Sequence, residues 1–207
     1  MALNQMNEEF NDAFETYFPR LSRAGKATYE VSTSLILRSI RAQRKILGGK
    51  RLVNERVFEY PYIFSRIRPR GAVLDIGCTS SRLPIQLASL GYHVHGVDLL
   101  DYPFTHPNFT FHKEDIFEWE PDRQFDTVIL LSTIEHFGLG IYGDDPRSGD
   151  MDTHAVVHVA RWLKKGGQMM VTTPFGKSGI THKHRIYDTA RLNMVFPASL
   201  FRRVDER

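Results

Sequence analysis

The stretch Val73–Leu99, VLDIGCTSSRLPIQLASLGYHVHGVDL, decides the fold of this chain. An apolar run leads into a turn at Gly77, a helical pattern with Pro84 near its start ends at Gly91, and a second apolar run ends at Asp98. This pattern predicts a strand, a tight turn, a helix and a second strand that ends in an acid. A nucleotide-binding βαβ unit has its elements in this order. Because the acid follows the turn by about twenty residues, we predict that it binds a ribose.

The alternation of strands and helices continues beyond this unit. Apolar runs bounded by turn residues predict strands, and helical patterns predict the helices between them. The alternation is typical of a doubly wound, mainly parallel α/β sheet with helices on both faces, which binds ligands beyond the carboxyl ends of its strands. The predicted strands are residues 72–77, 92–97, 109–113, 125–132 and 168–173, and the predicted helices are residues 81–91 and 153–165.

A helical extension is predicted over residues 1–70, before an α/β domain at 71–207. Residues 1–70 hold 13 Lys and Arg against 7 Asp and Glu, whereas the remainder holds 14 against 17. The basic amphipathic segment 31–51 can expose its charged face to solvent, or meet an anionic membrane or nucleic acid. Nucleic acid is the less favoured partner, because no base-stacking aromatic residue stands among the arginines. The predicted helices of the extension are residues 7–18, 31–47 and 53–67.

The composition is that of an ordinary globular protein, with 42% hydrophobic and 25% charged residues. No basic start is followed by an apolar run, and no window approaches the roughly 18 apolar residues of a membrane span. We therefore predict a cytoplasmic chain without a membrane span. The single cysteine, Cys78, cannot form an intrachain disulfide, and it is expected to be a small turn residue rather than a nucleophile.

Several motifs follow one another along residues 71–190. They are the turn at Gly77, the acid Asp98, the EDIF motif with Asp115, and the runs FDTVILLSTIEHFG and WLKKGGQMMVTTPFG. In their order and spacing these motifs resemble the class I S-adenosylmethionine-dependent methyltransferases. The resemblance implies a Rossmann-like methyltransferase fold, S-adenosylmethionine as cofactor, and an enzyme. The segment STIEHFGLGIYGD also resembles methyltransferases associated with glycan or secondary-metabolite pathways.

The donor has an adenosine and a charged amino-acid tail, and each part finds a candidate partner. Gly77 permits a close backbone approach, Asp98 can accept both ribose hydroxyls, Asp115 can accept from the adenine amino group, and Ile116 can cover the adenine face. Asp75 either lies near the amino end of the tail or braces a loop. The predicted donor-binding residues are Asp75, Gly77, Cys78, Thr79, Ser81, Asp98, Leu99, Asp115, Ile116 and Ser132.

Two residues depart from the family's pattern. Thr79 and Ser81 stand where second and third glycines are usual. Their Cβ atoms narrow the room for a donor, while their hydroxyls can hydrogen-bond its carboxylate. Ser80 or Ser81 can instead cap the following helix. A nicotinamide-dinucleotide enzyme is disfavoured because the G-x-G-x-x-G pattern is missing.

Methyl transfer is an in-line displacement, so the protein positions the acceptor and, for a hydroxyl, removes its proton. His136 and Glu135 follow the strand at 125–132 and are the predicted catalytic residues. Histidine has an unperturbed pKa near 6.5, which suits a general base. The alternative is that His136 braces the loop and that Glu135 has a structural role or contacts the donor.

Two loops are predicted to form the acceptor site. The loop 138–152 is rich in acids, but it lacks calcium-loop spacing, so we predict no metal. The second loop, 174–188, offers groups that suit an anionic or hydroxyl-rich acceptor. The predicted substrate-binding residues are Tyr142, Lys177, His184 and Tyr187.

The predicted reaction is methyl transfer to a small acceptor, on a hydroxyl oxygen of a sugar or another metabolite. A non-catalytic methyltransferase-like module and an RNA methyltransferase that uses the basic segment remain alternatives. After the strand at 168–173, only residues 200–204 can form a further strand, so the C-terminal strands are expected to be abbreviated. An open sheet edge invites pairing with another chain, and a homodimer is therefore expected.

Overall fold

The computed structural model describes residues 55–69, 71–142 and 150–205. The chain divides into two compact units, Met1–Asn54 and Glu55–Arg207, and the described residues belong to the second. The helices predicted at 7–18 and 31–47, with the basic segment that suggested nucleic acid, lie outside the described residues.

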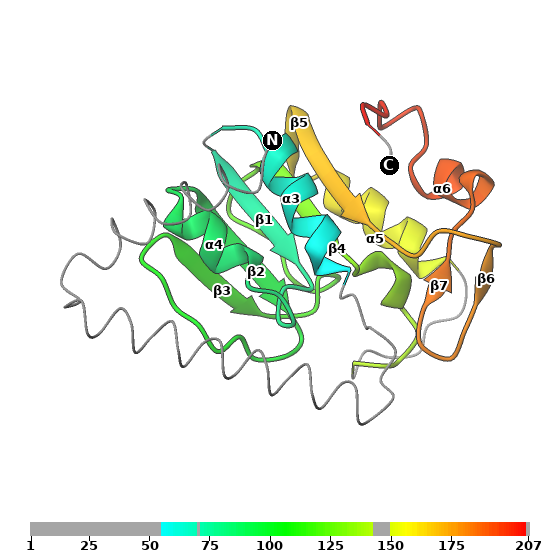
Figure 1. Cartoon of the computed structure of the whole chain (residues 1–207), viewed down its shortest axis with the longest axis horizontal. Coiled ribbons are helices and arrows are strands. Elements are labelled where there is room, and N and C mark those ends of the chain that lie inside the picture. Colours follow the sequence, from blue (N-terminus) through cyan, green and yellow to red (C-terminus); the bar gives the residue numbers. More distant parts are fainter. Residues whose placement is uncertain (1–54, 70, 143–149, 206–207) are drawn as a thin grey trace, which may run out of the picture. The chain divides into compact units, whose positions relative to one another are not determined.

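A five-stranded sheet forms the centre of the described unit (Figure 1). Its strands pair in parallel in the order β3-β2-β1-β4-β5. This confirms the predicted parallel α/β sheet, and the order reverses between β1 and β4, where open α/β sheets bind ligands at the carboxyl ends of the strands. The strands are β1 Ala72–Ile76, β2 His93–Asp98, β3 Phe109–Lys113, β4 Phe125–Leu131 and β5 Leu163–Thr172.

Helices cover both faces of the sheet, with α3 and α4 on one face and α5 on the other (Figure 1). None of the described helices has the length and apolar composition that a membrane crossing needs. The helices are α3 Arg56–Arg66, α4 Leu83–Ser89, the short 3-10 helix η1 Ile134–His136, α5 Met151–Ala160 and α6 Thr189–Val195; β6 Gly179–Ile180 and β7 Arg185–Ile186 form a separate antiparallel ribbon.

Successive side chains of each strand point to opposite faces of the sheet, and the core is therefore divided into two clusters. Leu74 and Ile76 of β1 pack in the cluster that contains α5. Val73 packs in the other cluster, with residues of α3 and α4. Asp75 lies between Leu74 and Ile76 in β1, so its side chain points to the face that α3 and α4 cover.

Two predicted elements differ from the structure. The helix predicted at 153–165 ends at Ala160, and β5 begins at Leu163 rather than 168. The carbonyl of Trp162 accepts the N–H of Phe125 at 2.8 Å, so the chain already follows β4 before the Gly166-Gly167 pair. Those glycines lie in a register shift inside β5, and they do not terminate the helix.

The strand predicted at 200–204 is wrong, because these residues pair with no strand. Phe201 packs against the cluster on the α5 face, whereas Asp205 forms a 2.8 Å ion pair with Arg66 of α3 on the other face. The segment therefore passes the β5 edge without adding a strand to it. Pairing of β5 with a second chain stays a prediction.

Candidate functional site

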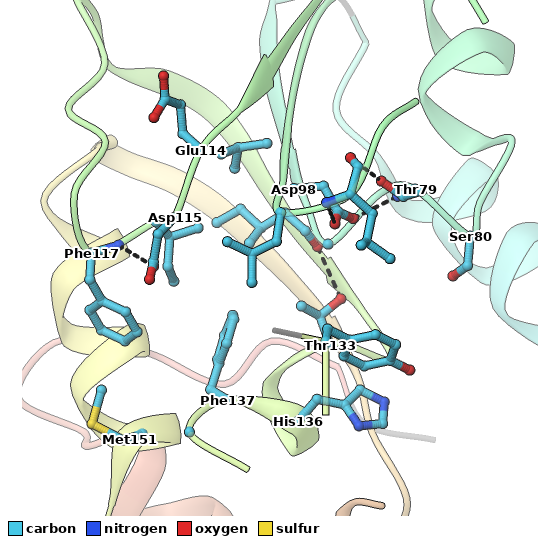
Figure 2. A pocket seen from close by; sticks show the side chains of 18 of the residues that line it. Thr79, Ser80, Asp98, Glu114, Asp115, Phe117, Thr133, His136, Phe137 and Met151 are labelled. Atoms are coloured by element: carbon cyan, nitrogen blue, oxygen red, sulfur yellow. Dashed lines mark hydrogen bonds between the residues drawn. The ribbon is translucent and has the colours of Figure 1, made fainter. Parts of the chain in front are cut away.

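A cavity of about 190 Å³ opens at the carboxyl ends of the strands, at the point where the strand order reverses (Figure 2). Residues after β1, β2, β3 and β4 line it together with η1. Of the predicted site residues, the cavity brings together Gly77, Thr79, Asp98, Leu99, Asp115, Ile116, Ser132, His136 and Tyr142. The residues outside its lining are Asp75, Cys78, Ser81, Glu135, Lys177, His184 and Tyr187.

The turn after β1 packs directly on Thr133, two residues beyond the end of β4. Gly77 has φ +72°, and a Cβ atom at this position would lie 2.4 Å from Thr133 Cγ2 and 2.6 Å from Thr133 Oγ1. The Thr133 hydroxyl donates a 3.0 Å hydrogen bond to the carbonyl of Ile76. Only glycine combines this conformation with this contact, so backbone rather than side chain faces the cavity here.

Asp98 ties the turn after β1 to the loop after β2. Its carboxylate accepts the N–H of Thr79 at 2.8 Å and the N–H of Leu100 at 3.0 Å (Figure 2). A carboxylate offers more acceptor positions than these two bonds use. Asp98 can therefore accept hydroxyl groups of a ligand while it keeps both backbone contacts.

The two residues that replace glycines have other partners. The Thr79 hydroxyl donates to the carbonyl of Leu100 at 3.0 Å. Ser81 is buried, and its hydroxyl contacts the hydroxyl of Tyr60 at 2.9 Å and accepts the N–H of Leu83 at 3.0 Å. Ser81 therefore supports the chain just before α4 and leaves the cavity unobstructed, but the capping alternative is wrong in its residue, because Arg82 is the N-cap of α4 and makes no side-chain cap.

One end of the cavity is apolar. Figure 2 shows Phe117, Phe137 and Met151 gathered on the side of Asp115. The Asp115 carboxylate accepts the N–H of Phe117 at 2.9 Å, which fixes the loop after β3. The rings of Phe117 and Phe137 meet edge to face with centroids 6.3 Å apart. A planar ring with a polar edge suits this end of the cavity.

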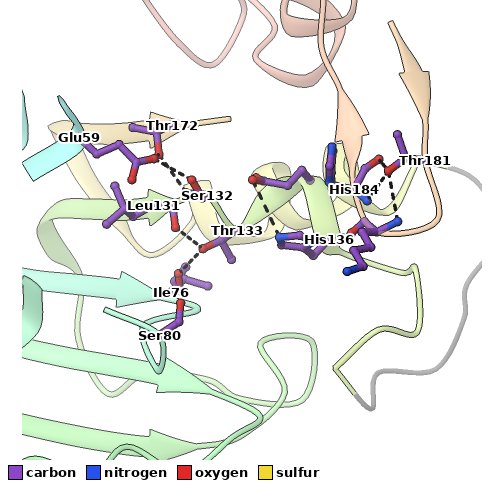
Figure 3. Close-up of polar contacts among 12 residues, drawn as sticks. Glu59, Ile76, Ser80, Leu131, Ser132, Thr133, His136, Thr172, Thr181 and His184 are labelled. Carbon is purple, nitrogen blue, oxygen red and sulfur yellow. Dashed lines mark hydrogen bonds and ion pairs between the residues drawn. The ribbon is translucent and has the colours of Figure 1, made fainter. Parts of the chain in front are cut away.

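His136 lines the side of the cavity away from Asp115 and Phe117 (Figure 2). Its Nδ1 is 2.7 Å from the carbonyl oxygen of Lys183, between β6 and β7. Because a carbonyl only accepts, Nδ1 carries the proton in this contact, and Nε2 is the basic atom of the neutral ring. The Tyr142 ring meets the His136 ring edge-on, with ring centroids 5.2 Å apart. The His184 ring also lies edge-on to His136, at 6.5 Å (Figure 3).

Glu135 is the middle residue of η1, and its side chain is buried. Burial raises the pKa of its carboxyl from 4.5 to about 7. Its Oε1 lies 4.0 Å from His136 Nε2, and among the described residues Oε2 has no hydrogen-bond partner. The side chain thus stands behind His136 instead of lining the cavity.

Asp75 is only 1% exposed, and neither carboxyl oxygen has a hydrogen-bond partner within the described part of the chain. Burial raises its pKa from 3.8 to about 8, the charge of Arg56 opposes this rise, and the charge of Asp98 adds to it. Burial, and then the neighbouring Asp75, also raise the pKa of the Cys78 thiol. Neither the neutral carboxyl nor the thiol suits a nucleophile.

A polar cluster that α3 contributes was not predicted from the sequence. The Glu59 carboxylate accepts hydrogen bonds from Ser132 Oγ at 2.7 Å and Thr172 Oγ1 at 2.5 Å (Figure 3). The same carboxylate pairs with Arg56 at 2.8 Å. Ser132 has φ +50°, a conformation that is uncommon for a residue with a side chain. The available signal was the spacing of Arg56, Glu59 and Tyr60, which places them on one helix face.

The predicted acceptor loops are only partly brought to the cavity. Tyr187 is 0% exposed and packs in the core, so its prediction as a substrate contact is wrong. Lys177 is exposed and lies outside the cavity lining. Asp150 and Asp152 both pair with Arg191, while residues 143–149 lie outside the described part. Within the described residues, no group of His, Cys, Asp or Glu side chains is arranged to hold a metal ion.

Residues 113–201 match a family described as Caenorhabditis protein of unknown function, DUF268. No curated protein matches the chain.

Two solved structures resemble the chain at low sequence identity. One is the Burkholderia thailandensis 1,6-didemethyltoxoflavin-N1-methyltransferase with bound 1,6-didemethyltoxoflavin and S-adenosylhomocysteine, at a TM-score of 0.57 and 16% identity over 90% of this chain and 84% of that one. The other is the PH0226 protein from Pyrococcus horikoshii, at a TM-score of 0.50 and 16% identity over 71% of this chain and 81% of that one. The described unit therefore has the fold of the class I S-adenosylmethionine-dependent methyltransferases.

Proposed function

We propose that the chain is an S-adenosylmethionine-dependent methyltransferase whose donor binds in the cavity at the carboxyl ends of the strands. The observation that carries the proposal is the convergence of Gly77, Asp98 and Asp115 on that cavity. The N1-methyltransferase of similar fold carries S-adenosylhomocysteine, which supports the same ligand class here.

The residues present fit the parts of this donor. Gly77 offers backbone without a Cβ atom, and Asp98 keeps acceptor positions for the two ribose hydroxyls. The apolar end beside Asp115 suits the adenine ring, with Leu99 and Ile116 as its covering side chains. The reacting end would then lie towards His136 and Tyr142.

Replacing Asp98 with alanine is expected to weaken binding of S-adenosylhomocysteine by about 30-fold, because the variant loses a charged acceptor for two hydroxyls. Calorimetric titration of the full chain measures this. Asp101→Ala is the matched control, since Asp101 follows the same strand but pairs with Lys113 at the surface. A folded wild-type chain that binds no S-adenosylhomocysteine would contradict the proposal and favour a non-catalytic module.

We further propose a hydroxyl oxygen of a small molecule, such as a sugar, as the acceptor atom. When bound, S-adenosylmethionine supplies the methyl group, whose bond to sulfur breaks as the bond to oxygen forms. His136 supports this reaction, because Lys183 fixes its proton on Nδ1 and leaves Nε2 to take the hydroxyl proton. Tyr142, at the rim of the same end, can orient the acceptor.

His136→Gln is expected to lower kcat by about 100-fold and to leave the affinity for S-adenosylhomocysteine unchanged, because a general base acts only on the acceptor. A panel of sugars and phenols with radiolabelled donor identifies the acceptor, and steady-state kinetics then compare the variant with His184→Gln. Full activity of His136→Gln would remove the base assignment. Methylation of amines alone would replace oxygen with nitrogen, the atom named for the Burkholderia thailandensis enzyme.

A further inference from the structure

The proposed donor brings a carboxylate at the end of its amino-acid tail, and the cavity lining offers it little positive charge. Apart from His136, the charged side chains that line the described part of the cavity are Asp98, Glu114 and Asp115, all acidic. Burying a carboxylate among acids is costly without a cationic partner. A cationic partner for the donor's carboxylate must therefore come from outside this lining, an inference that rests on the proposed function.

Arg56 stands where such a partner is needed. It is the first residue of α3, and its side chain is 17% exposed. Its Nη2 lies 3.5 Å from Ser80 Oγ, and its Nη1 lies 3.4 Å from the carbonyl oxygen of Leu131, the last residue of β4. Because Ser80 lines the cavity, the guanidinium stands at the cavity's border between the turn after β1 and the end of β4.

The guanidinium is held in place before any ligand arrives. Nη1 donates to Glu59 Oε2 at 2.8 Å. The other carboxylate oxygen of Glu59 accepts from Ser132 and Thr172, which follow and end neighbouring strands of the sheet. A side chain fixed in this way loses little conformational entropy when it binds, and the planar guanidinium matches the geometry of a carboxylate.

We infer that Arg56 binds the carboxylate of the donor's amino-acid tail, which replaces the long contact between Arg56 and Ser80. The contact with Ser80 is at the limit of hydrogen-bond distance, so little is lost when a charged oxygen takes its place. The pairing with Glu59 is kept, and it sets the direction in which the guanidinium points. Glu59 is thereby a positioning residue for Arg56.

A purely structural role for Arg56 is the competing explanation. Arg56 is the counter-ion of Glu59, and its charge also acts on the buried carboxyl of Asp75. In that case its loss would loosen the turn after β1 and the end of β4, and would weaken every adenosine ligand equally. Recognition of a carboxylate instead weakens only ligands that carry one.

Titration of the full chain and its variants with S-adenosylmethionine and with decarboxylated S-adenosylmethionine separates the two roles. Both ligands have the adenosine, the sulfonium and the amino group, and they differ in the carboxylate. We expect the wild type to prefer S-adenosylmethionine by about tenfold, and Arg56→Gln to abolish that preference while it binds the decarboxylated ligand as well as the wild type does. Arg56→Lys should retain part of the preference, because it keeps the charge without the planar group.

Arg66→Gln is the matched control, because Arg66 lies on the same helix and pairs with Asp205 away from the cavity. Equal affinity of the wild type for both ligands would overturn the inference without any variant. A preference that survives in folded Arg56→Gln, or an equal loss for both ligands, would also overturn it and leave the proposed function intact. A wild type that binds neither ligand would instead remove the proposed function and this inference together.

Discussion

Gly77→Ala is expected to destabilise the described unit by about 3 kcal/mol and to abolish measurable donor binding. Two costs add at this position. The left-handed conformation, φ +72°, is unfavourable for alanine, and the new Cβ atom would meet Thr133 at 2.4 Å. Relief of that contact must separate the turn after β1 from Thr133, and both line the cavity. Chemical denaturation measures the first effect, and titration with S-adenosylhomocysteine measures the second.

Gly91→Ala separates the two costs. Gly91 also has a positive φ, +89°, but no atom lies within 4 Å of the position of its Cβ. Only the conformational cost remains, so we expect a loss of about 1 kcal/mol and unchanged donor binding. In the double variant Gly77→Ala/Thr133→Ala the closest contacts disappear, and the combined loss of stability should be smaller than the sum of the two single losses. Additive losses would contradict the packing explanation.

Asp75→Asn is expected to stabilise the protein, and by more as the pH rises. The carboxyl has a pKa of about 8 in the folded state against 3.8 as its ordinary value, so folding retains a proton that the unfolded chain releases. The free energy of unfolding of the wild type therefore falls between about pH 4 and pH 8 and levels off above pH 8. Each unit of pKa corresponds to about 1.4 kcal/mol, so the difference between variant and wild type should reach several kcal/mol at pH 9.

Other groups confine the decisive measurement to the interval between pH 7 and pH 8. Glu135 has a pKa raised to about 7, so it also lowers the free energy of unfolding as the pH rises, and this effect ends near pH 7. Burial lowers the pKa values of His95, His112 and His158. These groups therefore change the free energy of unfolding only at pH values up to their ordinary pKa of 6.5. Urea unfolding at half-unit pH steps measures the free energy of unfolding. Between pH 7 and pH 8 this free energy should fall with pH in the wild type and in Asp101→Asn, and it should stay level in Asp75→Asn. A slope that persists in Asp75→Asn would disprove the assignment.

The strands were predicted well because their signal is local. Buried parallel strands are continuous apolar runs, and those that became β1, β3 and β4 were found to within about one residue of their ends. The start of β5 was missed, because Leu163 and the Gly166-Gly167 pair resemble a helix terminus in sequence. Only the pairing of Trp162 with Phe125 shows that the chain has already joined the sheet.

The residues that line the candidate site were predictable to the extent that they lie at strand ends. Asp98 ends β2 and Asp115 follows β3, and a parallel sheet brings such positions together. Glu59 and Arg56 were missed because α3 lies apart from the sheet in sequence, and nothing local indicates which surface a helix will cover. Tyr187 was misjudged for a related reason, since a loop position does not reveal that the ring turns into the core.

The cluster on the first turns of α3 also determines where the molecule can be cut. Arg56 contacts the end of β4. Glu59 accepts hydrogen bonds from Ser132 and Thr172, and Tyr60 contacts Ser81 just before α4. A fragment that starts at Gly71 would retain every strand yet leave these loop ends without their common anchor. The smallest fragment that keeps the candidate site intact is therefore longer than the smallest one that preserves the sheet topology, and a deletion series that aims to keep this site should begin before Arg56.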